Sequence, residues 1–407
     1  MTNDPAAPHE GPSLGLTAFF ALACGALAAN LYYAQPLVAP IAQSIGLDVS
    51  IESAIVTAAQ VGYGLGLAAL VPLGDVLENR RLILSTMAAT ILSLVGFAMA
   101  PNAATLFAMM LIVGLTSCAA QMLVPLAAHL APPAARGRVV GNVMSGLLGG
   151  ILLARPLSSF LSVQIGWRGV FLASAGLLLV VLASAVLLLP KRKPAAAHSY
   201  GELVASLGRL FLSEPVLRRR ALYHAAMFAA FSLFWTGAPL ILMRPPHEFT
   251  QTGIAFFALS GVLGVFAAPV AGRLADRGHS RRGTLTAMSC VVAGFALALA
   301  GPHSVAALVV AGILVDLGVQ ANLVIGQREI FQLDPTIRNR LNAVYMATFF
   351  AGGALGSALT SPALAHFGWT GLCLLGLGFP AVALLCALFG EGTVGAGRRE
   401  AFSSRPD

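Results

Sequence analysis

Twelve long apolar segments run through this chain almost from end to end, and no other feature constrains its fold as strongly. All twelve are at least 18 residues long, about the length that an α-helix needs to cross the hydrocarbon core of a bilayer. We expect these segments to be helices, because a helix satisfies its own backbone polar groups where no water is present. They lie near residues 14–43, 51–73, 82–100, 103–129, 139–163, 169–190, 221–243, 251–274, 283–300, 303–327, 341–366 and 370–390.

The composition argues against the soluble classes of protein. Hydrophobic residues make up 57% of the 407 residues and charged residues only 10%, whereas a soluble chain is about one quarter charged. So few charges cannot cover a protein surface in water, which excludes a cytosolic enzyme, a secreted disulfide scaffold and a disordered chain. We therefore expect an all-α membrane protein that is not an enzyme.

The net charge of +8 could suggest a nucleic-acid partner, but the positions of the basic residues explain it differently. All but three of the 24 lysines and arginines lie in alternate connections between the apolar segments or in the C-terminal tail; the exceptions are Arg155, Arg168 and Arg244. Basic residues accumulate on the cytoplasmic side of membrane proteins. The pattern therefore predicts that both termini are cytoplasmic, and it indicates no binding to nucleic acid.

Metal and cofactor chemistry are not indicated. The five cysteines lie inside apolar segments without a C-x-x-C pair, and the chain has no G-x-x-x-x-G-K-[ST] phosphate loop. We expect no metal site and no cofactor, and ATP is not expected to be the energy source.

The two halves of the chain repeat each other in the same orientation. Three motifs recur after 201 or 202 residues: I-G-W at 165–167 and F-G-W at 367–369, R-G-R at 136–138 and R-N-R at 338–340, and L-G-D at 73–75 and L-A-D at 274–276. Two six-span halves repeated in this way are the architecture of one large class of transporters. The repeat predicts five parts: a cytoplasmic tail (1–13), a six-helix bundle (14–190), a cytoplasmic linker (191–220), a second six-helix bundle (221–390) and a cytoplasmic tail (391–407).

These motifs resemble those of the major facilitator superfamily, and the resemblance extends over about residues 14–390. Its signature G-x-L-A-D-R-x-G-R-[RK] is similar to residues 272–278 followed by Arg281 and Arg282, and the first half keeps L-G-D at 73–75 with Arg80 and Arg81. The stretch N-L-Y-Y-A-Q-P at 30–36 resembles a subgroup of bacterial exporters in the twelve-span drug:proton antiporter and sugar-efflux branch.

The resemblance implies the major facilitator fold, with twelve transmembrane helices in two pseudo-symmetric six-helix bundles, in the bacterial inner membrane. It also implies a monomer whose partners are a small-molecule substrate, protons and the lipid bilayer. We expect a secondary transporter that exports a small amphipathic drug or metabolite in exchange for protons by alternating access. Two alternatives stay open. One is a proton symporter or facilitative uniporter of a sugar, organic acid or siderophore-like metabolite, and the other is a membrane sensor or scaffold that transports nothing.

The resemblance assigns a gating role to two aspartates. Asp75 is expected to meet the positive N-terminal end of the eleventh span, and Asp276 is expected to act likewise against the fifth span. The alternative is that both are ordinary solvated charges. The gating residues predicted from the two motifs are Asp75, Arg80, Arg81, Asp276, Arg277 and Arg281.

Asp316 is the acidic residue deep inside an apolar segment, about 16 Å from the end of its span at 1.5 Å per residue. A carboxylate at that depth is costly and usually functional, so we expect Asp316 to carry the coupled proton. The alternative is a protonated or hydrogen-bonded structural residue. Gln320 is four residues away and shares its helix face, which favours a cavity lining there.

Arg155 is the basic residue deep inside a span, about 24 Å from the start of its helix by the same count. It is expected to anchor negative charge on the substrate or to switch partners as Asp316 is protonated. The alternative is an arginine near the outer surface, held by backbone carbonyls.

Helices 1, 4, 7 and 10 line the central cavity in the resembled fold, and each carries polar or aromatic residues. Aromatic residues at helical spacing also occur in ordinary packing, which is the alternative for the seventh span. The predicted cavity residues are Asn30, Tyr33, Gln35, Gln121, Arg155, Phe231, Trp235 and Gln320.

Overall fold

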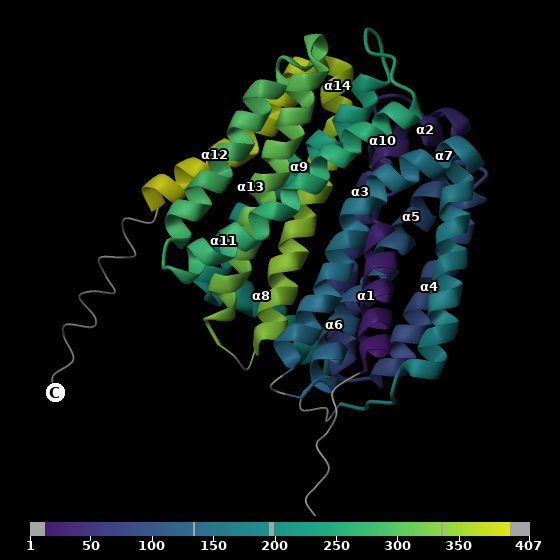
Figure 1. Ribbon diagram of the computed structural model, residues 1–407, viewed down its shortest axis with the longest axis vertical. Coiled ribbons are helices and arrows are strands. Elements are labelled where there is room, and N and C mark those ends of the chain that lie inside the picture. The colour runs from purple at the N-terminus through teal and green to yellow at the C-terminus, as the bar shows by residue number, and fades with distance from the viewer. Residues whose placement is uncertain (1–12, 133–134, 195–198, 335–336, 391–407) are drawn as a thin grey trace, which may run out of the picture.

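The fold is described from a computed structural model over residues 13–132, 135–194, 199–334 and 337–390. The predicted tails, 1–13 and 391–407, lie outside these residues apart from Ser13. Every regular element in the described ranges is helical, either α or 3-10. Two helical bundles stand side by side, the N-terminal one in purple to teal and the C-terminal one mostly in green to yellow (Figure 1).

The N-terminal half is built from α1 (Leu14–Ala29), η1 (Gln35–Leu37), α2 (Val38–Ile45), α3 (Ala54–Ala69), η2 (Val71–Asp75), α4 (Asn79–Ala98), α5 (Ala103–Ser117), α6 (Ala119–Leu130) and α7 (Arg136–Leu188). Helix α8 (Tyr200–Ser213) follows. The C-terminal half contains α9 (Pro215–Leu242), α10 (Gln251–Leu259), η3 (Ser260–Phe266), α11 (Ala267–Asp276), α12 (Ser280–Ala298), η4 (Gly301–His303), α13 (Val305–Phe331) and α14 (Arg338–Gly390).

Helices α7 and α14 are the clearest structural expression of the sequence repeat. Each has 53 residues and is bent at one glycine with a left-handed φ, 67° at Gly166 and 63° at Gly368. A residue with a Cβ rarely adopts this backbone conformation, so the glycine of the repeated G-W pair allows the chain to reverse. Each long helix therefore supplies two membrane spans.

The structure confirms the predicted fold class of twelve transmembrane helices in two six-helix bundles. Eight helical stretches in the described residues are long and apolar enough to cross a membrane, and two of them are the bent helices α7 and α14. The remaining two spans are α12 and the first segment, which is divided into α1, η1 and α2.

Helix α8 lies between the two halves, inside the predicted linker 191–220. It begins with a capping box, in which Ser199 and Glu202 each bond to the other's backbone, an arrangement that stabilises a helix start. Leu203 and Leu207 are buried, and the hydroxyl of Tyr200 donates to the carbonyl of Ala69 at 3.0 Å. Helix α9 starts at Pro215, six residues before the predicted 221.

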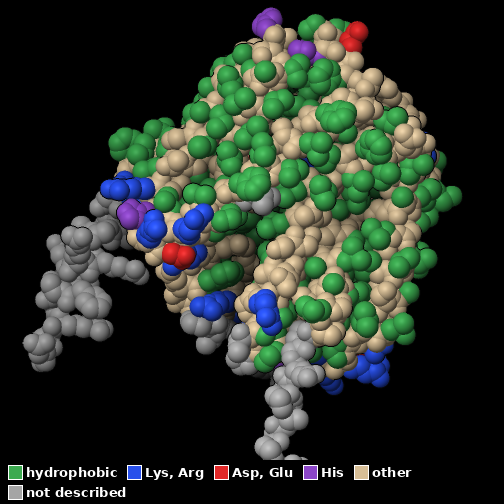
Figure 2. Space-filling model, in the orientation of Figure 1, with side chains coloured by type: hydrophobic (Ala, Val, Ile, Leu, Met, Phe, Trp, Pro, Cys, Tyr) green, Lys and Arg blue, Asp and Glu red, His purple; other side chains and the backbone are tan. Residues whose placement is uncertain are grey.

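The two ends of the bundle differ in charge. Lysine and arginine side chains gather at the lower end in Figure 2, whereas the middle of this face is covered by hydrophobic side chains. We call the end that carries Arg80, Arg136, Arg192, Arg281 and Arg340 the basic end. The other end, which contains the bends at Gly166 and Gly368, is called the opposite end.

Candidate functional site

One indole connects the predicted proton carrier with the buried arginine. The Nε1 of Trp235 on α9 donates a hydrogen bond to Oδ2 of Asp316 on α13 at 2.7 Å. The guanidinium carbon of Arg155 on α7 lies over the same indole, 4.4 Å from the ring centre. All three side chains are buried. The acid and the base therefore contact the edge and the face of a single ring at the interface between the halves.

Arg155 lies among neutral groups. Its Nε donates to Oε1 of Gln35 at 2.8 Å, and its guanidinium carbon is 4.8 Å from the ring centre of Phe231 and 5.5 Å from that of Tyr32. Cation–π contacts of this kind offset part of the cost of burying a positive charge. Three aromatic rings and one amide thus surround the guanidinium.

Glycines allow the helices to approach closely enough to form this site. A Cβ added at Gly150 on α7 would lie 2.3 Å from the carbonyl oxygen of Gly25, so α7 packs directly on the backbone of α1. A Cβ at Gly264 in η3 would lie 2.5 Å from Cβ of Asp316, and one at Gly261 would lie 2.7 Å from the ring of Trp235. Small residues permit such close packing in membranes.

Stacked rings continue from this site along α9 and α14 within the C-terminal half. The ring centres are 5.1 Å apart for Phe231 and Phe228, 3.7 Å for Phe228 and Phe349, 4.5 Å for Phe349 and His224, and 5.4 Å for His224 and Tyr345. All four pairs are stacked. The aromatic stripe predicted on the seventh span therefore packs against α14 as well as against Arg155.

Polar contacts between the halves are found toward the opposite end. Ser53 and Ser361 exchange backbone-to-hydroxyl hydrogen bonds, and one turn further Thr57 and Ser357 lie 3.0 Å apart, oxygen to oxygen. Deeper still, Nε2 of Gln60 donates to the hydroxyl of Ser232 at 2.7 Å.

An ion pair between the halves lies at the same end, where Arg244 approaches Glu52 at 3.6 Å. These contacts join α3 and the residues before it to α9 and α14, so the two halves are closed against each other at the opposite end.

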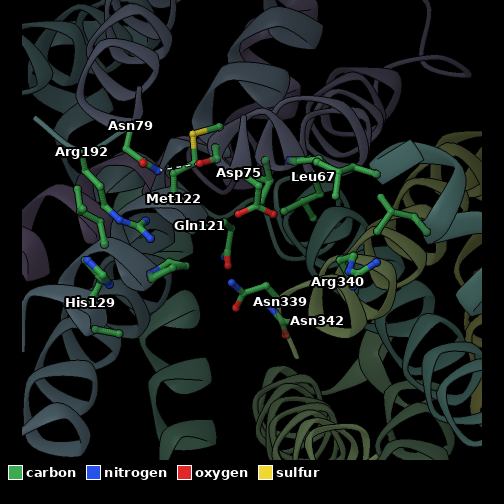
Figure 3. A pocket seen from close by; sticks show the side chains of 18 of the residues that line it. Leu67, Asp75, Asn79, Gln121, Met122, His129, Arg192, Asn339, Arg340 and Asn342 are labelled. Carbon is green, nitrogen blue, oxygen red and sulfur yellow. Dashed lines mark hydrogen bonds between the residues drawn. The ribbon is translucent and has the colours of Figure 1, made fainter. Parts of the chain in front are cut away.

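A cavity of about 370 Å³ separates the halves at the basic end. Figure 3 shows side chains from both halves around it, with Asp75 and Gln121 facing Asn339, Arg340 and Asn342. The amide of Gln121 donates to the hydroxyl of Tyr63 at 3.2 Å, and the ring of Tyr63 packs 4.4 Å from that of Phe350 across the interface. Contact between the halves thus begins where the cavity ends.

The structure brings together only part of the predicted cavity lining. Gln35, Arg155, Phe231 and Trp235 meet at the central site, and Gln121 lines the cavity at the basic end. Gln320 is half-buried one turn from Asp316.

Two predicted cavity residues are buried inside the N-terminal bundle instead. The carbonyl of the Asn30 side chain accepts from Ser174, and Tyr33 packs edge-on against Phe171. Both face the second half of α7, because α1 ends beside it and unwinds there.

The predicted gating residues have different surroundings. Asp75 is exposed at the end of η2 and shares the cavity with Arg340 of α14. Arg80 donates to the carbonyl of Val186, and Arg81 approaches the neighbouring Glu78.

In the second half, Asp276 pairs with Arg328 of α13, within its own bundle, rather than with the fifth span. Arg281 donates to the carbonyl of Leu388 at 3.2 Å, and Arg277 is exposed. In this conformation, only Asp75 faces the other half across the cavity.

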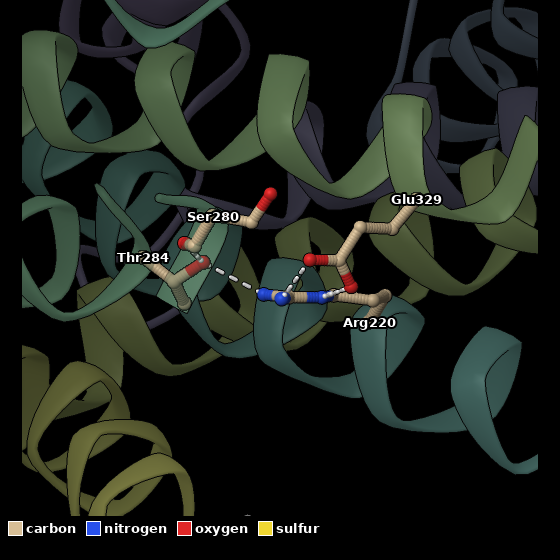
Figure 4. A network of polar contacts seen from close by, with 4 residues as sticks. All are labelled: Arg220, Ser280, Thr284 and Glu329. Atoms are coloured by element: carbon tan, nitrogen blue, oxygen red, sulfur yellow. Dashed lines mark hydrogen bonds and ion pairs between the residues drawn. The ribbon is translucent and has the colours of Figure 1, made fainter. Parts of the chain in front are cut away.

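One buried ion pair was missed by the sequence analysis. Arg220 on α9 makes two hydrogen bonds to the carboxylate of Glu329 on α13, at 2.5 and 2.6 Å, and a third to the hydroxyl of Thr284 at 2.7 Å (Figure 4). The sequence predicts Arg220 at the end of the linker (191–220), but α9 begins before it and buries it. A signal was available in Glu329, an acid two residues beyond the predicted tenth span.

Comparisons with known proteins agree with this architecture. The family model described as Major Facilitator Superfamily matches residues 18–330. The chain is 40% identical to the transporter YgaY of Escherichia coli (strain K12) over 381 residues, covering 93% of this chain and 96% of that protein. It is 33% identical to the transporter SCO4007 of Streptomyces coelicolor over 382 residues, covering 91% of this chain and 88% of that protein.

Among solved structures, the D-xylose-proton symporter has a similar fold, with a TM-score of 0.72 at 15% identity, and the match covers 91% of this chain and 96% of that one. The relatives are named as transporters, and the fold, the repeat and the cavity between the halves are those of a transporter. The chain belongs to the Major Facilitator Superfamily.

Proposed function

We propose that this transporter couples the movement of a small amphipathic solute to that of protons, with Asp316 as the proton carrier. The contact that supports the proposal is the hydrogen bond between Asp316 and Trp235, because Trp235 also stacks on Arg155 of the other half. An ionisable side chain deep in a membrane protein is costly and usually marks a functional site. A change in the charge of Asp316 alters a contact that both halves share.

We propose alternating access as the mechanism, with the basic end facing the cytoplasm of a bacterium and both termini on that side. The solute enters the cavity at the basic end while the contacts of Ser53 and Glu52 keep the opposite end closed. The halves, taken as residues 14–190 and 221–390, then rock about the central site within one monomer. Such rocking of one repeat against the other is how many transporters expose one site to each side in turn.

Asp75 is the proposed gate at the basic end. It lies in the cavity wall with Asn339 and Arg340, at the start of α14. The N-terminal end of a helix attracts negative charge, so closure of the cavity brings Asp75 to a favourable partner. Asp276 acts in the corresponding place of the second half after leaving Arg328.

Two modes of coupling suit this site. Export in exchange for protons is the first, supported by the resemblance of residues 30–36 to bacterial exporters; here the solute and the proton occupy the site in turn. Symport is the second, and Arg155 favours it. A proton on Asp316 removes a negative charge from the neighbourhood of the guanidinium, so that a proton and an anionic solute bind together.

The test is solute-dependent proton movement in liposomes that contain the purified protein and a pH-sensitive dye. A panel of drugs and organic metabolites is added, and the direction of the proton flux separates exchange from symport. Asp316→Asn should abolish proton-driven accumulation and leave exchange of solute for solute, because the amide holds no mobile proton. Asp48→Asn, a change of an exposed aspartate at the opposite end, serves as the control.

Proton-driven accumulation by Asp316→Asn at the wild-type rate would overturn the assignment of the carrier. Loss of folding in this variant, seen as aggregation in detergent, would assign Asp316 a structural role. If no solute in the panel moves protons or is itself moved, the proposal of coupled transport is wrong.

A further inference from the structure

The guanidinium of Arg155 is buried, yet every group in direct contact with it in the described structure is neutral. Its exposed fraction is 2%, and it touches the Gln35 amide and the rings of Tyr32, Phe231 and Trp235. A buried charge is costly unless a partner of opposite charge accompanies it.

Asp316, which contacts the same indole, accepts the N–H of Trp235 with Oδ2. The indole therefore lies against both ionisable groups, and the guanidinium keeps its capacity to bind an anion.

Gln35 provides a second donor at the same place. Its Oε1 accepts from Arg155, while its Nε2 is buried and has no hydrogen-bond partner in the described structure. A buried N–H group without a partner is expensive. The amide and the guanidinium are thus two adjacent donors, one of them charged, and carboxylates suit such a pair because their oxygens accept several hydrogen bonds.

The cavity at the basic end carries positive charge, which suits an anionic solute. Its positively charged lining residues are Arg136, Arg192 and Arg340, whereas Asp75 is the acid among its described lining residues (Figure 3). A cleft lined mainly by one sign of charge raises the local concentration of solutes of the other sign. Leucine and methionine side chains also line this cavity, which suits a solute with an apolar body.

We infer that the solute is an organic anion, a carboxylate with an apolar or aromatic body, whose acidic group binds Arg155 and Gln35. The inference rests on the proposed transport function and names its substrate class. The body of the solute packs against Phe231 and Trp235, which the guanidinium now covers. An anion at Arg155 and a proton on Asp316 favour each other's binding, so this class of solute selects symport from the two modes.

The first experiment compares three probe series of equal shape on the wild-type protein in detergent. The carboxylates are benzoate, phenylacetate and 1-naphthoate, the neutral probes are their amides, and the cations are the corresponding arylalkylamines. Binding is measured by quenching of tryptophan fluorescence and by the shift in Tm. At least one carboxylate should bind tenfold or more tightly than its amide and its amine.

The second experiment uses variants of the arginine. Arg155→Gln should remove the preference for the carboxylate over the amide, and Arg155→Lys should retain part of it, because the charge stays but the planar fork is lost. Arg168→Gln is the matched control, since Arg168 also stacks on a tryptophan, at 4.3 Å from the Trp167 ring, but is exposed at the opposite end. It should leave the preference unchanged.

The outcomes separate this inference from the proposed function. Proton flux in liposomes with the amines or amides but not with the carboxylates would overturn the anion inference and leave coupled transport standing. Carboxylate binding that is unchanged in Arg155→Gln would also overturn it. Equal binding of all three series, or binding of none, would also contradict the inference. This test uses only the wild-type protein, so its result does not depend on the folding of any variant.

Discussion

The hydroxyl of Ser53 accepts a hydrogen bond from the backbone N–H of Ser361 at 3.1 Å, and the hydroxyl of Ser361 accepts one from the N–H of Ser53 at 2.9 Å. The two residues belong to different halves and make reciprocal hydrogen bonds, as expected of a contact near a pseudo-symmetry axis. Both side chains are buried. The pair closes the opposite end of the path between the halves.

Replacing both serines by alanine should therefore loosen this closure. A neutral hydrogen bond contributes about 0.5–1.5 kcal/mol, so the double variant should shift the equilibrium toward opening by roughly 1–3 kcal/mol. The measurement is the rate at which a membrane-impermeant thiol reagent labels Thr57→Cys from the opposite side in a cysteine-free background. Ser162→Ala is the control, because this hydroxyl donates to Ser159 within one helix. Equal labelling rates in the double variant and the parent would show that the serines do not hold the gate.

The affinity for the solute should depend more on the ring of Trp235 than on its N–H. Trp235→Ala removes the surface on which Arg155 stacks and should weaken solute binding by roughly 1 kcal/mol or more. Trp235→Phe keeps a ring but no donor for Asp316, so it should alter the pH dependence of transport more than the affinity.

Equilibrium binding and pH profiles of uptake check both outcomes for Trp235. Trp369→Phe is the control, since Trp369 donates to the carbonyl of Ala298 near the opposite end. If Trp235→Ala binds the solute as tightly as the wild type, the aromatic stripe on α9 serves packing alone.

Gly264→Ala should damage the central site by steric overlap. The added Cβ would lie 2.5 Å from Cβ of Asp316 and 3.1 Å from its backbone carbon, and overpacking of this kind typically costs about 1–3 kcal/mol. Gly272→Ala on α11 should be tolerated, because its nearest neighbour is 4.0 Å away. Thermal unfolding in detergent, together with transport, compares the two. Equal Tm and activity in both variants would contradict the close approach of η3 to α13.

Substitutions of Arg220 and Glu329 should have non-additive effects on the stability of the protein. Arg220→Met leaves a partly buried carboxylate unpaired, and breaking such a pair should cost roughly 3 kcal/mol, the low end of the range for buried ion pairs. The double variant Arg220→Met with Glu329→Gln should recover part of this loss, because no charge remains without a partner. Thermal denaturation of the single and double variants measures the coupling. Strict additivity would mean that the two side chains do not stabilise each other.

Local sequence carried most of the information on the fold. Whether a segment becomes a membrane helix depends on its own length and polarity, because each helix satisfies its backbone internally. The repeated I-G-W and F-G-W motifs identify Gly166 and Gly368 as equivalent positions. Both glycines adopt the left-handed φ that the bends require. The sequence does not predict α8 as a helix, because its 14-residue segment is too short and too polar to be a membrane span.

The partners of the polar side chains were decided by tertiary packing. Counting along the helices separated Arg155 from Asp316 by roughly 8 Å in depth, and a third residue, Trp235, fills that gap by contacting both. Asn30 lies on the first span, which lines the cavity in the resembled fold, but its side chain accepts a hydrogen bond from Ser174, because α1 ends beside the second half of α7.

By itself, then, the sequence determined the twelve spans, the repeat and the presence of an acid and a base inside the bilayer. Only the tertiary structure decided which ring joins that acid to that base, and that Ser53 meets Ser361 more than 300 residues away. The physical reason is the range of the forces involved. Burial of an apolar segment is a property of that segment, whereas a hydrogen bond acts over about 3 Å and forms only after distant helices have packed.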